Sequence, residues 1–271
     1  MSREHVYREM TELLGVVPTF FSNVSEKSLE LEWELFKLVE LQEGTIPGKY
    51  RELVGLAVSS VTGCSHAIHF HKQAAKFKGA TDAEIEDALH FAMSAAGMSA
   101  YFEGIGMSDE THERDVLESI RRRAENPHAG WGSQDLPNDA SRDEVYKAIE
   151  GAIWLVPTPF QCMSKATLPL EWKLNQLLWY GKGDLHPKHR HLIGVGLGAA
   201  IRNRKSVFLH TQMAKAFGAS DAEIEEAAYM AKISVSWAVY INGQEADLEQ
   251  FSSEIAAGID HMTVREAAPS T

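Results

Sequence analysis

Apolar residues recur every three or four positions along most of the chain, a spacing that predicts helices. One such stretch runs from about Ser25 to Leu41, and the next follows Ile46-Pro47-Gly48 and continues to Val61. Another helix is expected to open at Cys64 and to stop at Gly79, because glycine often forms the left-handed C-terminal cap of a helix. No alternating stretch is long enough to predict a strand, so the expected fold class is all-α.

This helical pattern occurs twice in the chain. Val17-Pro18-Thr19 recurs 139 residues later as Val156-Pro157-Thr158. The same shift relates Leu31-Glu32-Trp33 to Leu170-Glu171-Trp172, His71 to His210, Gly79–Glu86 to Gly218–Glu225 and Tyr101 to Tyr240. A single shift without a gap predicts two copies of one helical domain.

The repeat predicts a first domain at residues 1–125, a linker at 126–140 and a second domain at 141–271. The linker segment is rich in Pro, Gly and Asn, and its Trp131 is expected to be exposed. In each copy a capping box, with Ser or Thr three residues before Glu, predicts the start of a helix after the glycine cap. Residues 98–122 are expected to form one further helix, and residues 248–259 an amphipathic segment near the end.

The composition narrows the class of protein. The chain has 271 residues, of which 44% are hydrophobic, so it can bury two cores. Its net charge of −12 argues against binding to nucleic acid or to an anionic membrane surface. No apolar run is long enough to span a bilayer, and the charged N-terminus does not resemble a signal peptide, which predicts a cytoplasmic protein. Two cysteines, Cys64 and Cys162, do not form a disulfide scaffold.

The candidate chemistry lies in the stretch from Glu52 to His71, which contains a carboxylate, a thiol and three imidazoles. Cys64 follows a glycine at the expected start of a helix, where backbone N–H groups favour a nucleophilic thiolate; a buried, inert cysteine is the alternative. His71 lies seven residues later on the same helix face and can serve as acid or base. Glu52 either finds a buried partner such as this histidine or faces water.

The second copy replaces most of these groups. His191 stands at the position of Glu52 and Asn203 at that of Cys64, whereas His210 repeats His71. His210 is then either a structural pin or part of a second site with His191. We otherwise expect His186, His189 and His191 on the surface. Cys64, His66, His69 and His71 have poor spacing for four convergent ligands, so neither a metal nor another cofactor is expected.

These residues resemble the alkylhydroperoxidase D-like and carboxymuconolactone decarboxylase-like superfamily. Its peroxidase branch carries a Glu followed by Cys-x-x-Cys-x-x-x-His, which Glu52, Cys64 and His71 match; Cys64-Ser65-His66 also matches and adds His66 to the expected site. The resemblance covers both copies. The second cysteine of the motif, which the family is expected to use against peroxide, is Ala67 here, so a two-cysteine cycle within this motif is impossible.

The resemblance implies two functions, and the altered second copy adds a third. The first is a peroxidase-like, antioxidant thiol oxidoreductase in which Cys64 is oxidised, Glu52 and His71 relay protons, and an external thiol reduces the enzyme. The second is a cofactor-free lyase or decarboxylase that acts on a small carboxylate or lactone by His and Glu proton transfer. The third is a non-catalytic binding protein. The family also implies a homo-oligomer, expected to be a trimer that acts as a pseudo-hexamer.

Overall fold

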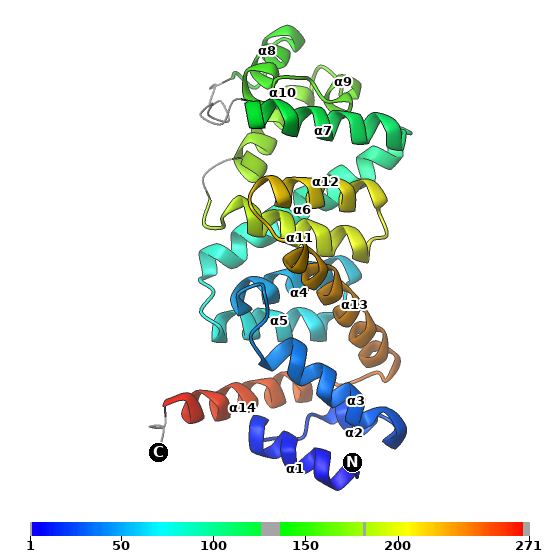
Figure 1. Cartoon of the computed structure of the whole chain (residues 1–271), viewed down its shortest axis with the longest axis vertical. Coiled ribbons are helices and arrows are strands. Elements are labelled where there is room, and N and C mark those ends of the chain that lie inside the picture. Colours follow the sequence, from blue (N-terminus) through cyan, green and yellow to red (C-terminus); the bar gives the residue numbers. More distant parts are fainter. Residues whose placement is uncertain (1, 126–135, 181–182, 268–271) are drawn as a thin grey trace. The chain divides into compact units, whose positions relative to one another are not determined.

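The computed structural model describes residues 2–125, 136–180 and 183–267, and in these ranges every regular element is a helix (Figure 1). The first copy contains α1 (Arg3–Leu14), α2 (Thr19–Ser22), α3 (Glu26–Phe36), the π-helical turn η1 (Lys37–Leu41), α4 (Gly48–Thr62), α5 (Ser65–Phe77), α6 (Asp82–Gly104) and α7 (Asp109–Glu125). The second copy contains α8 (Arg142–Ile153), α9 (Thr158–Cys162), α10 (Leu168–Asn175), the π-helical turn η2 (Gln176–Tyr180), α11 (Pro187–Ala200), α12 (Arg204–Ala216), α13 (Asp221–Gly243) and α14 (Leu248–Ala267). None of these helices is long and apolar enough to cross a membrane. The all-α prediction is confirmed.

Helix ends follow the expected chemistry at several points. Gly63, Gly79 and Gly218 adopt positive φ angles of 71°, 88° and 89°, where a side chain would be strained. In the second copy, Ser220 and Glu223 bond to each other's backbone N–H groups, at 3.2 and 2.8 Å, as a capping box does.

Two helix boundaries differ from the predictions. Residues 98–122 do not form one helix: α6 continues to Gly104 and α7 begins at Asp109. Gly106, at a φ of 63°, makes the turn between them. The C-terminal helix α14 extends to Ala267, beyond the expected residue 259. Linker residues 126–135, including Trp131, lie outside the described residues.

The chain forms two compact units whose borders differ from those of the sequence repeat. Unit 1 consists of residues 1–82 and 229–271, and unit 2 of residues 83–228. Unit 1 therefore combines the first five helices of the first copy with the last helices of the second copy. Unit 2 contains α6, α7 and the first helices of the second copy. The predicted domain borders remain a hypothesis about the ancestry of the two copies.

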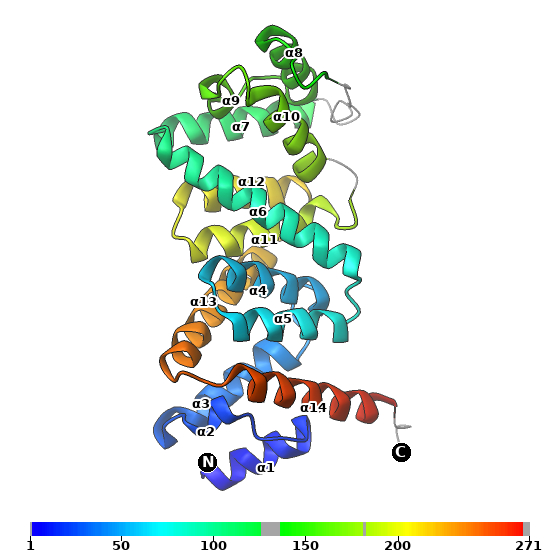
Figure 2. The same ribbon diagram turned by 180° about the vertical axis from the view of Figure 1, so that it is seen from behind.

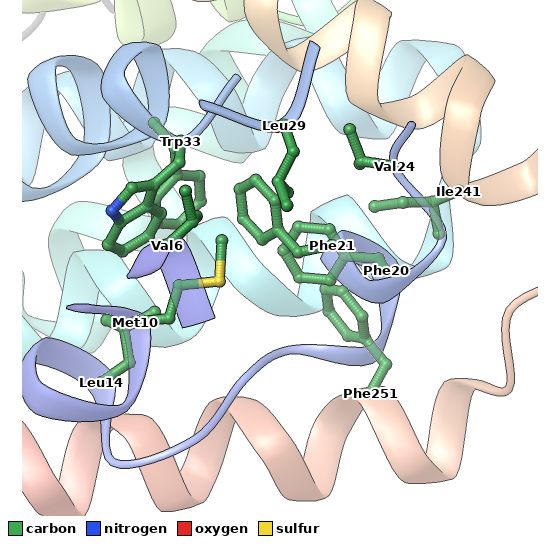
Figure 3. Close-up of a cluster of buried hydrophobic side chains, with 11 residues drawn as sticks. Val6, Met10, Leu14, Phe20, Phe21, Val24, Leu29, Trp33, Ile241 and Phe251 are labelled. Carbon is green, nitrogen blue, oxygen red and sulfur yellow. The ribbon is translucent and has the colours of Figure 1, made fainter. Parts of the chain in front are cut away.

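The core of unit 1 joins its N-terminal and C-terminal segments (Figure 3). Phe20 and Phe21 of α2 lie at its centre, with Trp33 of α3 on one side. Ile241 of α13 and Phe251 of α14 close the cluster from the C-terminal segment. Burying aromatic rings of this size is the largest stabilising term available to such a bundle.

Helix α14 lies alongside α5 within unit 1 (Figure 2). It is tied to α2 by Glu254, whose Oε2 accepts a 2.8 Å hydrogen bond from the backbone N–H of Thr19. Unit 2 repeats this contact, since Asp115 of α7 accepts a 2.8 Å bond from the backbone N–H of Thr158. In each unit a helix from one copy thus caps a short helix of the other, and the carboxylate satisfies N–H groups that a helix start leaves free.

Candidate functional site

A buried network of charged side chains lies in unit 1. Glu52 of α4 is fully buried, and its Oε2 lies 2.9 Å from Nδ1 of His71 on α5. Its other oxygen, Oε1, accepts a 2.5 Å bond from Nζ of Lys78, which follows α5. The structure therefore brings together two of the predicted site residues and adds a lysine that the sequence analysis did not consider.

His71 has a defined place and orientation. Because an ionised carboxylate only accepts hydrogen bonds, Nδ1 of His71 carries the proton that points at Glu52. Nε2 lies 3.1 Å from the hydroxyl of Ser234 on α13, which accepts from the charged ring and donates to the neutral one. The ring lies against Gly55: a Cβ atom there would come within 2.4 Å of Cε1 of His71. Glycine at this position makes room for the imidazole.

A second buried carboxyl belongs to Glu40, which lies in the π-helical turn η1. Its Oε2 has no hydrogen-bond partner among the described residues. Turns of this kind often occur at functional sites, because they interrupt the regular bonding of a helix. The backbone carbonyl of Glu40 accepts a 2.6 Å bond from Lys78, so the same ammonium group contacts both glutamates.

The two carboxyl groups have pKa values displaced in opposite directions. Burial, reinforced by the nearby Glu52 charge, raises the pKa of Glu40 to about 7. Burial also acts to raise the pKa of Glu52, but Lys78 and His71 outweigh it and lower that pKa to about 2. Burial opposes the charged form of His71, yet its bond to Glu52 and the charges of both glutamates raise its pKa overall. At neutral pH, Glu52 is ionised while Glu40 can lose or gain a proton.

Glu40, Glu52 and Lys78 line a cavity of about 270 Å³. Most of its wall is apolar and comes from α1, α2, α3, α5 and α14. Side chains of this wall include Leu14, Phe36, Phe70, Phe77, Ile255, Ile259 and Met262. An apolar cavity with a few convergent polar groups and displaced pKa values is the usual form of a small-molecule site.

A smaller cavity of about 30 Å³ adjoins the network and is lined by Glu40, Ala67, His71 and Ser234 among others. Its volume is sufficient for one or two water molecules. Glu40 lines both cavities, as do Phe20, Phe36 and Phe70.

Cys64 and His66 bond to partners outside this network. Cys64 is the N-cap residue of α5 and is fully buried. It packs with Ala67 and Ala238, and its Sγ lies 3.5 Å from Oδ1 of Asn242. Neither of the two cavities just described has Cys64 in its lining. Nε2 of His66 lies 2.8 Å from the backbone carbonyl of Ala246, so this ring joins α5 to the segment before α14.

Unit 2 holds a different arrangement at the equivalent positions. Nδ1 of His191 lies 3.0 Å from Nδ1 of His210, and both rings are buried. Burial, with small contributions from neighbouring positive groups, lowers the pKa of His191 well below its ordinary value and that of His210 to about 3. Both imidazoles are therefore neutral at physiological pH. The expectation that His189 and His191 lie on the surface is wrong, because both side chains are buried in the core of this unit.

Aromatic rings surround this histidine pair. Phe217 stacks on His191 at a centroid distance of 5.7 Å, and Trp179 lies 5.2 Å from His210. In the repeat, Trp179 corresponds to Glu40 and Phe217 to Lys78. The equivalent cavity, lined by Trp179, Tyr180 and Met213, has a volume of only about 70 Å³. The second copy thus replaces the charged groups by rings and fills most of the space.

The ligand atoms of Glu40, Glu52 and His71 lie within 4.8 Å of one another, a spacing compatible with one metal ion. Lys78 already supplies positive charge at this point, 2.5 Å from Glu52. Because an ammonium group repels a divalent cation, these residues fit proton chemistry better than metal binding. The group does not include Cys64, His66 or His69, the other potential ligands in the sequence.

Sequence reasoning missed Glu40, Lys78, Ser234 and Gly55. One signal for two of them was available: under the shift of the repeat, Glu40 and Lys78 become aromatic, as Glu52 becomes His191. Charged residues that vanish together from one copy indicate a shared role in the other. Ser234 gave no such signal, since it lies in the other copy and only tertiary structure brings it to His71.

Comparisons with known proteins agree with this fold. The family model described as the carboxymuconolactone decarboxylase family matches residues 29–108 and 170–243. A crystal structure of a protein provisionally named a gamma-carboxymuconolactone decarboxylase subunit, from Burkholderia xenovorans LB400, has a TM-score of 0.57 and 13% sequence identity, and the match covers 98% of each chain. At that identity it shows a shared fold alone. No curated protein matches the chain.

Proposed function

Since the chain belongs to the carboxymuconolactone decarboxylase family, we propose that the cavity of unit 1 catalyses proton transfer at carbon in a small carbonyl compound. The reaction is of the lyase or isomerase type and uses no cofactor. One observation carries this proposal: Glu40, with an unpartnered buried oxygen, lines the same cavity as the ionised Glu52. Two carboxyl groups whose environments displace their pKa values in opposite directions are the usual sign of an acid–base pair.

Glu40 is the general base. A pKa of about 7 places this group near the pH at which a base both accepts a proton well and is available in ionised form. Glu52 is a poor base, because its pKa is about 2 and both of its oxygens are bonded. Glu40 removes a proton from the carbon next to the substrate carbonyl: the C–H bond breaks, an O–H bond forms on Glu40, and the electron pair moves to the carbonyl oxygen as an enolate.

Lys78 stabilises this enolate. An ammonium group has three N–H donors, and Lys78 uses two on Glu52 and on the carbonyl of Glu40. The third is available to an oxygen in the cavity that Lys78 lines. The enolate then either loses a leaving group, as in a lyase, or takes a proton back at another carbon, as in an isomerase.

Glu52 and His71 hold the network in position. The carboxylate of Glu52 anchors Lys78 and raises the pKa of Glu40 through its charge. His71 fixes the other oxygen of Glu52 and is itself held by Ser234. They are positioning residues, since the reacting atoms meet Glu40 and Lys78.

The test is exchange of substrate hydrogen with solvent. Small ketones and lactones are incubated with the protein in D2O, and deuterium entry next to the carbonyl is followed by NMR. We expect exchange that rises with pH through about 7, because Glu40 acts in its ionised form. Glu40→Gln should lower the rate by about 10²- to 10⁴-fold.

The matched control is Glu43→Gln, three residues further on and exposed, which should leave exchange unchanged. Cys64→Ser should also retain full activity. Exchange that persists in Glu40→Gln, or that disappears in Cys64→Ser, contradicts this function.

A thiol-dependent peroxidase is the second candidate, with one observation in its favour. Cys64 is a free thiol at the N-cap of α5, a position that reactive cysteines often occupy. Against it, the side chain is fully buried and absent from the lining of the two cavities beside His71. Oxidation of Cys64 by peroxide, followed by its reduction by an external thiol, would favour the peroxidase over the acid–base function.

We also propose that the chain forms a homo-oligomer, expected to be a trimer, in which copies of the chain meet through exposed leucines. Leu31 and Leu38 of the first copy are 67% and 57% exposed, and the equivalent Leu170 and Leu177 are 45% and 63% exposed. The same apolar positions exposed in both copies favour contact between equivalent surfaces of several chains. Sedimentation should show an oligomer that Leu31→Glu with Leu38→Glu dissociates, and a monomeric native chain contradicts the proposal.

A further inference from the structure

The large cavity of unit 1 is more apolar than the family's name suggests. That name refers to a carboxylated lactone, whereas the wall of this cavity is built mainly of aromatic and aliphatic side chains. On α14, Ile255, Ile259 and Met262 recur at a helical spacing and present one apolar face to the cavity. Phe70 and Phe77 of α5 line it as well.

The cations on this wall already have partners. Lys78 is bonded to Glu52 and to the backbone carbonyl of Glu40. Arg265, on the last turns of α14, is exposed and donates to the backbone carbonyl of Glu12. Glu52 balances the charge of Lys78, whose remaining N–H can still bond a carbonyl oxygen, and the exposed Arg265 keeps its charge in water. An enolate formed together with a proton on Glu40 adds no net charge to the cavity, whereas an entering anion adds one that no buried cation of this lining balances.

The carboxylates on the wall repel an anion. Glu52 is ionised, and Glu254 accepts bonds from Thr19 and Gln250. An anionic ligand would add negative charge beside these two groups and would lose its hydration without a dedicated partner. An uncharged ligand avoids both costs, and its apolar surface gains from leaving water.

The fold does not require this cavity to be open. In unit 2 the equivalent space shrinks from about 270 to about 70 Å³. Met213 lines that smaller cavity and corresponds to Ala74 in the larger one. Unfilled apolar volume lowers stability, so its retention in one copy points to a ligand that occupies it.

We propose that this cavity binds an uncharged, mainly apolar carbonyl compound, and that it discriminates against carboxylates of the same size. This inference rests on the proposed function only for the carbonyl group; the apolar body and the lack of charge follow from the wall. Of the two substrate classes that the family resemblance implies, it selects the lactone or a ketone over the carboxylate.

The experiment compares two fluorescent probes with the same ring skeleton. N-phenyl-1-naphthylamine is uncharged, and 8-anilinonaphthalene-1-sulfonate adds one negative charge. We expect the uncharged probe to bind at least tenfold more tightly. Ala74→Met, which installs the residue of the second copy, should weaken its binding about tenfold, as should Ile259→Trp if the first variant does not fold.

The control is Met213→Ala in unit 2, which should leave binding of the uncharged probe unchanged. Probe binding needs no turnover, so failure of the catalytic proposal, read from deuterium exchange, is distinguishable from failure of this one, read from the two affinities. Equal or tighter binding of the sulfonate would overturn the proposal, as would binding of the uncharged probe that is insensitive to both cavity-filling variants.

Discussion

The two units share one helical frame, but the interior of unit 1 is charged and open whereas that of unit 2 is neutral and mostly filled. In unit 1, Glu52, Lys78 and His71 form a charged network beside an open cavity. In unit 2, the equivalent histidine pair is neutral and lies among Trp179, Phe217 and Phe91. Of the residues in these two networks, only His71 and its equivalent His210 are the same amino acid in both copies.

This difference distinguishes the residues that the fold requires from those that the proposed reaction requires. A histidine packed over a glycine occurs in both units, since Gly55 lies under His71 and Gly194 under His210. This pair therefore belongs to the frame. The carboxylates and the lysine occur in one unit alone, although burying charge is costly. A group retained at such a cost, next to a cavity, is better explained by function than by stability.

The largest expected effect comes from replacing the charged residues of unit 1 by their equivalents in unit 2. The triple variant Glu40→Trp, Glu52→His, Lys78→Phe should lose proton exchange by about 10²- to 10⁴-fold. Its free energy of unfolding should stay within about 2 kcal/mol of the native value, because apolar groups can replace a buried ion pair without loss. Denaturant unfolding and NMR exchange measure the two effects.

A single change is the control for that variant. Glu52→Gln should cost about 3 kcal/mol, because it leaves Lys78 and His71 without their charged partner. If the triple variant is far less stable than Glu52→Gln, the two interiors are not interchangeable, and the comparison between the units fails.

Acid should weaken unit 2 before unit 1. His210 has a pKa of about 3 in the folded chain against an ordinary 6.5, so its stabilising effect is complete above pH 6.5 and declines as the pH falls toward 3. The loss is about 2 kcal/mol at pH 5 and about 4 kcal/mol at pH 3. Glu52, lowered from 4.5 to about 2, contributes stability that is lost only below pH 4.5.

Amide hydrogen exchange read by mass spectrometry can follow both units in one sample. Between pH 7 and pH 5, after correction for the intrinsic rate, peptides from residues 83–228 should lose protection while those from unit 1 keep it. Equal loss in both units would contradict the assignment of the early transition to the histidine pair.

Alanine at the two glycines should affect the units unequally. A Cβ atom at residue 55 or 194 would lie 2.4 or 2.3 Å from the adjoining imidazole ring, so each variant should lose about 1–3 kcal/mol by overpacking. Only Gly55→Ala should also slow the exchange of substrate hydrogen with solvent, because it displaces His71 from Glu52. Equal activity in Gly55→Ala and Gly194→Ala would show that His71 does not position the network.

The smallest expected effect is a gain of thiol chemistry at Cys64. Ala67 lies three residues after Cys64 and lines the small cavity beside His71. Ala67→Cys should form a reversible disulfide with Cys64 and give slow but measurable peroxide consumption, whereas Ala67→Ser should not. Mass spectrometry after peroxide treatment detects the loss of two hydrogens. No disulfide in Ala67→Cys would indicate that the frame no longer supports thiol chemistry.

Much of the frame follows from the sequence. Helical spacing, the glycines at residues 63 and 79 and the capping boxes are local signals, and each acts over a few residues. The family match over residues 29–108 and 170–243 confirms the expected superfamily and is consistent with the tandem repeat. Glu52 and His71 could be selected because they fit a short motif on neighbouring helices. The sequence left open whether Glu52 bonds to His71 or faces water, and the structure shows the bond. The motif also gave no sign that Cys64 is absent from the cavity lining.

Only the tertiary structure decided which helices of one copy pack against the site residues of the other. The carboxyl of Glu40, the hydroxyl of Ser234 and the apolar face of α14 reach one site from segments far apart in the chain. No local rule connects them, because helix periodicity fixes which face is apolar but not which distant helix will cover it. The displaced pKa of Glu40 likewise arises from burial beside Glu52, a property of packing that no sequence position carries by itself.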